Sequence, residues 1–242
     1  VVLSADSTLG SFGELSKAFD PRKTFSATLQ IRQASERLNA ADESMSNAEY
    51  LKLLRGVRNS LIGAFGKKSY ASYISIINNA GSDKNRFLNE ILQNADDCSY
   101  PVEVVPEFSL KLDGDILTAA YNECGFTKDN VRAITAIGES TKKLLLNGED
   151  RAIGENGIGF KSVFGVAEEV EIHSNGFDFK LSDKMPTVPD KCEEIPDSVG
   201  TIMKYKLKDK SVMKAFSEDR IIHTCLCLRN IKVITISNVR LT

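Results

Sequence analysis

The sequence predicts an α+β fold, a two-layer sandwich in which helices cover one face of a mixed, mostly antiparallel sheet. Three observations predict it. Alternating apolar residues flank Asp-Gly and Asn-Gly pairs, which indicates β-hairpins, and helical patterns separate these hairpins along the chain. The regular strand–helix–strand alternation of a parallel sheet is absent. The chain has 242 residues, 42% of them hydrophobic, which suits one large domain with an extension.

The first third of the chain predicts helices and carries no obvious chemistry. Apolar residues recur at helical spacing over residues 26–40 and 46–62, and a third helix is expected over 68–78. We therefore predict an N-terminal helical extension over residues 1–80. A second domain, over residues 81–242, holds the hairpins and the motifs described below.

The second domain begins with a strong helix over 83–97. A hairpin follows, with strands at 108–112 and from Ile116 onward that turn at Asp113-Gly114, and a helix over 127–136 begins at Thr127 as N-cap. Residues 138–159 are rich in glycine and polar residues. The remaining elements are a helix from about Gly159, strands at 170–173 and 177–181 joined by Ser174-Asn175-Gly176, strands at 201–207 and 231–237, and a helix over 217–227.

Composition excludes some classes of function. Lys and Arg number 31 against 33 Asp and Glu, so the net charge of -2 gives no global attraction to nucleic acid or to an anionic membrane. No apolar run approaches the 20 or so residues of a membrane span, and no signal peptide is visible. The cysteines are odd in number and irregularly spaced, which indicates reduced thiols and an intracellular protein, cytoplasmic or nuclear: Cys98, Cys124, Cys192, Cys225 and Cys227.

The helix over 83–97 carries a polar stripe. Glu90, Asn94 and Asp97 lie at positions i, i+4 and i+7 and share one face, while apolar residues fill much of the remaining circumference. The stripe alone is equally compatible with a face turned to solvent. The residue types favour chemistry, since an Asn oxygen suits Mg²⁺ and a carboxylate one turn away suits activation of a water molecule.

A glycine-rich loop is the second motif. Its closely spaced glycines precede a helical pattern, so backbone N–H groups are able to approach an anion at a helix N-terminus. A flexible turn without a ligand is the alternative. The loop is not a Walker A motif, because Phe160 separates Gly159 from Lys161, and the dinucleotide fingerprint lacks its third glycine at Ser162.

Together these motifs resemble the nucleotide-binding domain of the gyrase, heat-shock chaperone, histidine kinase and MutL class, the GHKL ATPases, whose pocket is the Bergerat fold. Glu90, Asn94 and Asp97 match its Glu-x-x-x-Asn-x-x-Asp box, residues 154–160 match its glycine-rich lid box, and Gly200-Thr201 matches its late Gly-Thr. The resemblance spans about residues 83–210. Within the class, the chain is most similar to sacsin-type and plant NO VEIN-type proteins, with the microrchidia ATPases a more distant alternative.

The resemblance implies a role for each matching residue. Glu90 would be the general base for attack of water on the γ-phosphate, and Asn94 would be the Mg²⁺ ligand. Asp97 would support the adenine end of the pocket indirectly, and Thr201 would contact adenine directly or through water. A lid between about Gly138 and Gly154 would cover the nucleotide. Gly154, Gly157 and Gly159 would give backbone N–H groups to the phosphates, assisted by Lys161. The rest of the expected nucleotide-binding set in this loop is Asn156, Ile158 and Phe160.

One motif departs from the class, which recognises adenine with Asp-x-Gly-x-Gly. Alignment of its last glycine to Gly125 places Tyr121 at the aspartate and Glu123 at the first glycine. We expect Asn122 or Glu123 to substitute at the adenine end, beside Gly125.

The sequence thus predicts a domain that binds ATP and Mg²⁺ and hydrolyses ATP, within a larger chaperone-like or remodelling protein. ATP and ADP are its expected ligands, and a nucleotide-dependent second copy or further domains of the same chain are its expected partners. The alternative is a non-catalytic nucleotide-sensing or protein-interaction module, with residues 26–78 as the partner surface. A histidine-kinase domain is disfavoured, because neither His173 nor His223 lies in a phosphoacceptor motif.

Overall fold

The computed structural model describes residues 29, 32–33, 36–40, 45–80, 84–136, 160–195, 199–209, 211–212 and 218–237. The predicted lid and most of the glycine-rich loop, at residues 138–159, lie outside these described residues.

Most of the predicted helices are confirmed within the described part of the chain, but the helix expected from about Gly159 continues only as a short 3₁₀ helix over Ser162–Gly165. Ser46 and Thr127 act as N-caps, each in a reciprocal capping box with the residue three positions on, Glu49 or Asn130, and these boxes fix where two of the helices begin. The helices are α3 (Asn47–Phe65), α4 (Lys67–Ala80), α5 (Lys84–Asp96), α6 (Lys128–Ile134), the 3₁₀ helix η3 (Ser162–Gly165) and α8 (Glu218–Cys225).

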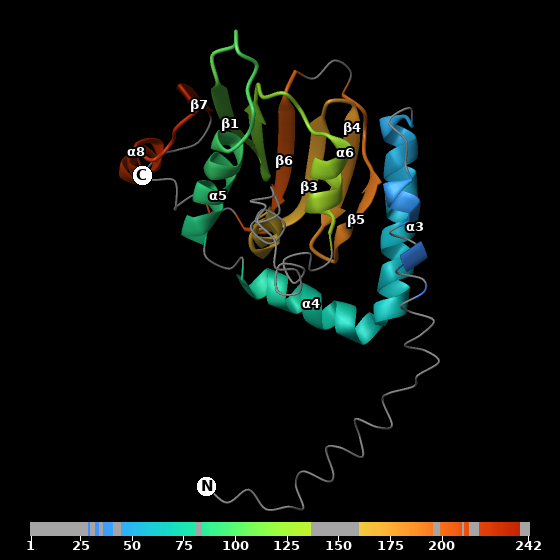
Figure 1. The fold of residues 1–242 in the computed structure, drawn as a ribbon. Coiled ribbons are helices and arrows are strands. Elements are labelled where there is room, and N and C mark those ends of the chain that lie inside the picture. The colour runs from blue at the N-terminus through green and yellow to red at the C-terminus, as the bar shows by residue number, and fades with distance from the viewer. Residues whose placement is uncertain are drawn as a thin grey trace, which may run out of the picture.

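The strands form one seven-stranded sheet in the order β5-β4-β3-β6-β2-β1-β7 (Figure 1). Neighbouring strands are antiparallel except β1 and β7, which are parallel. The sheet is therefore mixed and mostly antiparallel, as predicted. Its strands are β1 (Glu107–Asp113), β2 (Ile116–Tyr121), β3 (Ala167–Ser174), β4 (Phe177–Ser182), β5 (Met185–Lys191), β6 (Thr201–Leu207) and β7 (Val233–Ser237).

The sequence predicted the turns of both hairpins to within one residue. Asp113 pairs with Ile116, so the first loop is Gly114-Asp115, one residue later than predicted, and Gly114 takes the left-handed conformation that this turn requires (φ 62°). The second connection was predicted over Ser174-Asn175-Gly176, but Ser174 pairs with Phe177 as the last residue of β3, so the loop is Asn175-Gly176, and both residues have positive φ, 48° and 74°.

Strand β5 was not predicted from the sequence. It contains Pro186 and Pro189, which disrupt a strand pattern, and the structure explains them by placing β5 at an edge of the sheet. Its inner side packs on the N-terminal helices, where the Tyr70 and Thr187 hydroxyls are hydrogen-bonded at 2.8 Å.

The two faces of the sheet differ in chemistry. Helices α5 and α6 lie over the inner face, while α3 runs beside the β5 edge (Figure 1). Leu54, Phe87, Ile172 and Tyr205 belong to one buried cluster, so the helices over 47–80 share a core with the sheet. The outer face carries ion pairs between strands, such as Lys204 with Glu171 at 3.3 Å. The predicted domain boundary at residue 80 stays a prediction.

Candidate functional site

Helix α5 presents two of the predicted site residues one turn apart. Its apolar side is buried in the core, with Ile91 and Leu92 each 2% exposed. Glu90 and Asn94 are partly buried beside this surface. The Glu90 carboxylate is 16% exposed and pairs with Arg86, whose Nε lies 2.8 Å from Oε1. A carboxylate and an amide oxygen therefore lie on the same side of a helix that the core holds in place.

The C-terminal end of α5 carries two neighbouring acids with different surroundings. Asp97 lies just past the last residue of α5 and is exposed. Asp96 is buried, and its carboxylate accepts hydrogen bonds from the backbone N–H groups of Arg229, Asn230 and Ile231 at 2.8–2.9 Å. Burial raises the pKa of Asp96, but these three donors outweigh burial, so the net pKa lies below its usual value. Asp96 thus anchors the segment before β7, a role that sequence reasoning missed.

A buried polar corner lies where β2, β3 and β6 meet. Glu123, Ser174 and Thr201 are all buried, with exposed fractions of 6%, 1% and 0%. The Thr201 hydroxyl donates to Glu123 Oε1, and the Ser174 and Thr201 hydroxyl oxygens are 2.5 Å apart. Glu123 Oε2 accepts the backbone N–H of Gly125 at 2.7 Å. Burial raises the pKa of Glu123, although the Thr201 and Gly125 hydrogen bonds oppose this shift.

Two glycines make this corner compact. Gly200 has φ 74°, and a Cβ there would collide with the backbone of residues 121–123. Gly125 has φ 82°, and its Cβ would lie 2.6 Å from the Cβ of Asn175. Both positions therefore require glycine, for conformation and for space. Because Gly200 packs closely against the backbone of residues 121–123, the next residue, Thr201, lies with its hydroxyl at Glu123.

The corner lies beside the C-terminal end of α5. The backbone N–H of Cys124 donates to the carbonyl of Ser99 at 2.9 Å, and the Tyr100 hydroxyl donates to the carbonyl of Ala95 at 2.9 Å. Burial, together with the charges of Glu123 and Asp97, raises the pKa of the Cys98 thiol to about 12. The rise of 1.5 Å per residue places Glu90 about 10 Å along the helix from this end.

Two other predicted residues make structural hydrogen bonds. The Asn122 side chain accepts the N–H of Glu107 at 2.8 Å and donates to the carbonyl of Val105 at 2.9 Å. Lys161 is 2% exposed, and its Nζ donates to the carbonyl of Ala136 at 2.6 Å. Phe160 is buried edge to face against Phe164. Their predicted nucleotide contacts stay predictions, as do those of the glycine-loop residues outside the described part: Gly154, Asn156, Gly157, Ile158 and Gly159.

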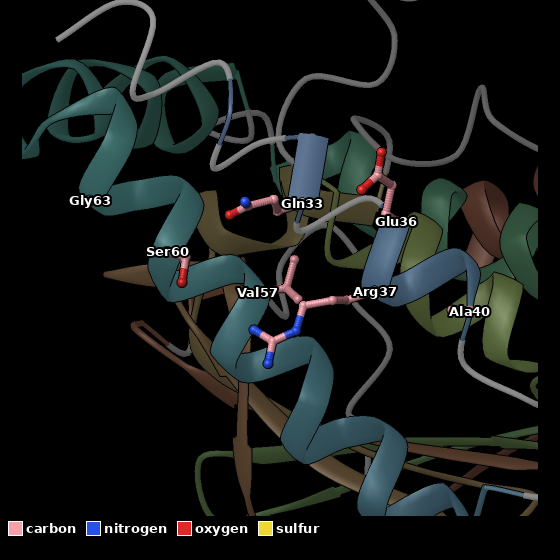
Figure 2. A pocket seen from close by; sticks show the side chains of 7 residues that line it. All are labelled: Gln33, Glu36, Arg37, Ala40, Val57, Ser60 and Gly63. Carbon is pink, nitrogen blue, oxygen red and sulfur yellow. The ribbon is translucent and has the colours of Figure 1, made fainter. Parts of the chain in front are cut away.

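A separate cavity of about 920 Å³ lies between α3 and a group formed by Gln33, Glu36, Arg37 and Ala40 (Figure 2). Figure 2 shows Gln33, Arg37, Val57 and Ser60 around it, and none of the predicted site residues lines it. Among the described residues, no cluster of three or more His, Cys, Asp or Glu side chains is arranged to hold a metal ion. No helix in the described part of the chain is long and apolar enough to cross a bilayer.

The fold is consistent with a Bergerat-like sandwich, as the motif resemblance implied. No family model matches the chain. It is 48% identical over 100 residues to Protein NO VEIN of Arabidopsis thaliana and 34% identical over 118 residues to human sacsin, which are 41% and 43% of this chain but 4% and 2% of those proteins. It is 28% identical over 165 residues to the endoplasmin homolog of Hordeum vulgare, 56% of this chain and 20% of that protein. These partial similarities support a GHKL-like relationship.

Proposed function

We propose that this chain binds Mg-ATP between α5 and the Glu123 corner and hydrolyses it slowly, as one module of a larger chaperone-like protein. The observation that carries the proposal is the buried Glu123–Thr201 pair beside the C-terminal end of a helix that presents Glu90 and Asn94. The similarity to sacsin and to the endoplasmin homolog supports the same class. A second copy, or further domains of the same polypeptide, would complete the working unit.

The Glu123 corner fits a base that offers N–H donors. An ionised carboxylate has about four lone-pair sites, and within the described residues Thr201 and Gly125 fill two of them. A hydrogen bond donated to the remaining acceptor sites of this buried carboxylate is strengthened by the low dielectric around it. The amino group of adenine would donate to Glu123, and Thr201 would hold the carboxylate in position for it.

The side of α5 that carries Glu90 and Asn94 fits the phosphates. Asn94 would offer a neutral oxygen to Mg²⁺, which takes oxygen ligands and keeps several waters and phosphate oxygens. Bound Mg²⁺ would neutralise part of the negative charge of the phosphates. Glu90, oriented by Arg86, would accept the proton of the attacking water.

Calorimetric titration of the purified chain with Mg-ATP, Mg-ADP and Mg-GTP tests the proposal. We expect saturable binding of the adenine nucleotides. Asn94→Ala should abolish the magnesium-dependent part of ATP binding, with Asn59→Ala, a surface Asn of α3, as the matched control. Absence of saturation with every nucleotide at millimolar concentration would contradict the proposal.

A second candidate function is nucleotide sensing without hydrolysis. The Arg86–Glu90 ion pair favours it, because the guanidinium occupies Oε1 of the carboxylate that would have to bind the attacking water. Release of phosphate from Mg-ATP distinguishes the two functions. Binding of ATP with no phosphate release above that of the Glu90→Ala variant would select the sensing module.

A further inference from the structure

A chain of hydrogen bonds connects the first turn of α3 to the Glu123 corner. Asn47, the first residue of α3, donates from Nδ2 to the carbonyl of Asn175 at 2.7 Å. Asn175 in turn donates from Nδ2 to the carbonyl of Phe126 at 3.0 Å. The β3–β4 turn is therefore hydrogen-bonded to α3 on one side and to the segment after Glu123 on the other.

The chain continues to the carboxylate itself. The backbone N–H of Phe126 donates to Ser174 Oγ at 2.8 Å, and Ser174 Oγ is hydrogen-bonded to Thr201 Oγ1. Thr201 donates to Glu123. Four segments that are far apart in the sequence thus meet in one network, from the start of α3 to the group proposed to bind the base.

Steric contact makes this connection stiff. Asn175 has φ 48°, and its Cβ lies where a Cβ on Gly125 would be only 2.6 Å away. On the other side of the turn, a Cβ on Gly176 would lie 3.2 Å from Asn47 Nδ2. The turn is packed between α3 and Gly125, so a shift of α3 displaces Gly125 and Phe126 rather than being absorbed by empty space.

Further contacts hold the same turn of α3 against the start of α6. Lys128 donates from Nζ to the carbonyl of Met45 at 2.7 Å, and the Tyr50 hydroxyl donates to the carbonyl of Lys128 at 3.2 Å. The buried Tyr50 ring also packs edge to face on Phe177, with ring centroids 6.3 Å apart. The segment 125–128 therefore rests on the first turn of α3 at both of its ends.

We infer that the N-terminal turn of α3 positions the base-binding corner, with Asn47 as a positioning residue that sets affinity for the nucleoside part of the ligand. The inference rests on the proposed function. It makes the helical extension part of the nucleotide-binding site. Docking of α3 strengthens binding of the base, and binding of the base strengthens docking of α3 by the same free energy. A partner that displaces this turn of α3 would weaken nucleotide binding.

Two variants of Asn47 separate positioning from stability. Asn47→Ala removes the donor, and Asn47→Asp keeps the shape, removes the donor and adds a negative charge at the first residue of a helix, where it favours folding. Asn59→Ala, also on α3 but about three turns along, is the control. The measurements are the dissociation constants for Mg-ADP and for magnesium tripolyphosphate, a phosphate-only probe, together with the thermal unfolding midpoint.

The loss of one positioning hydrogen bond should weaken Mg-ADP binding about three- to tenfold in both Asn47 variants. Tripolyphosphate binding should change less than about twofold, the Asn47→Asp midpoint should not fall, and Asn59→Ala should bind both ligands as the unmodified chain does. Unchanged ADP binding in both Asn47 variants, or an equal loss for tripolyphosphate, would overturn the inference and leave the proposed function intact. Failure of the unmodified chain to bind ADP would overturn both.

Discussion

The middle and the C-terminal end of α5 differ in what surrounds them. Beside the C-terminal end, Glu123, Thr201 and Ser174 form a network of buried hydrogen bonds, and Asp96 anchors a neighbouring segment. At the middle of the helix, Glu90 is 16% exposed and is held by Arg86, whose side chain is 60% exposed. The first region is part of the fold, while Glu90 is a partly buried group on one side of the helix. Substitutions should therefore affect stability and base affinity in the first region and turnover at Glu90.

Removal of Glu90 gives the largest expected effect. Glu90→Ala should lower the rate of ATP hydrolysis by a factor on the order of 10²–10⁴, the usual contribution of a general base, with ADP affinity and the unfolding midpoint nearly unchanged. Steady-state phosphate release measures the rate, and thermal unfolding measures the fold. Gln93→Ala, at an exposed position of the same helix, is the matched control and should leave the rate unchanged. A marked fall in the unfolding midpoint of Glu90→Ala would mean that the rate is lost because the fold is lost, which would contradict a role for Glu90 in turnover alone.

Asp96 should matter for stability rather than for turnover. Asp96→Ala removes an acceptor of three backbone hydrogen bonds and should cost about 3 kcal/mol of unfolding free energy, measured by urea denaturation at pH 7. Asp97→Ala, at the exposed neighbour, is the control and should cost less than about 0.5 kcal/mol.

The pH dependence of this loss has a definite sign. Because the pKa of folded Asp96 lies below its unfolded value, Asp96 stabilises the fold above the unfolded pKa, and this contribution is lost as the pH falls through the folded pKa. The difference between the unmodified chain and Asp96→Ala should shrink between about pH 5 and the lower folded pKa. A difference that grows on acidification would contradict the assigned hydrogen bonds.

The sequence bears on these two regions in different ways. The spacing of Glu90 and Asn94 predicts that they share one side of α5, because helical periodicity is a local property. The segment beside the C-terminal end departs from the expected adenine motif, yet the structure brings Glu123 to Thr201. That meeting depends on pairing of β2 with β6 and on the close approach of Gly200, which are long-range features that no local pattern encodes.

The same difference between local and long-range contacts explains which other elements could be predicted from the sequence. Capping boxes and glycine turns act within a few residues, so the starts of α3 and α6 and the Asn175-Gly176 turn were predictable. Strand β5 was missed because its prolines are tolerated only at the sheet edge, which is a property of the finished sheet. The Asn47–Asn175 hydrogen bond joins residues 128 positions apart, and each residue alone has an ordinary local reason to be Asn.

Neutralisation of Glu123 tests the C-terminal end directly. Glu123→Gln keeps the shape and removes the charge, so Mg-ADP should bind about tenfold more weakly, while tripolyphosphate binding stays unchanged. Burial raises the pKa of Glu123, so its ionised form costs stability as the pH rises through this raised pKa. The Gln variant should therefore lose less than about 1 kcal/mol of unfolding free energy at pH 7, measured with urea. Equal weakening of ADP and tripolyphosphate binding would show that the corner does not bind the base.

The smallest effect is expected on the outer face of the sheet, where β6 carries Lys204 on the side opposite Thr201. Lys204 pairs with Glu171 at 3.3 Å, and both side chains are about one third exposed, 34% and 29%. Lys204→Met should cost less than about 1 kcal/mol in dilute buffer, with a smaller loss in 1 M salt because exposed charges are screened.

Lys204 lies three residues from Thr201 on the same strand. This variant therefore tests whether a change on the outer face of β6 alters the Glu123 corner. The core residues Met203 and Tyr205 hold the strand on its inner face, so the backbone at Thr201 should not move and ADP affinity should be unchanged. Lys206→Met, which removes the neighbouring pair with Glu168, is the matched control. A loss of ADP affinity above about threefold in Lys204→Met alone would mean that the charge ladder on the outer face, and not only the inner hydrogen bonds, sets the position of Thr201.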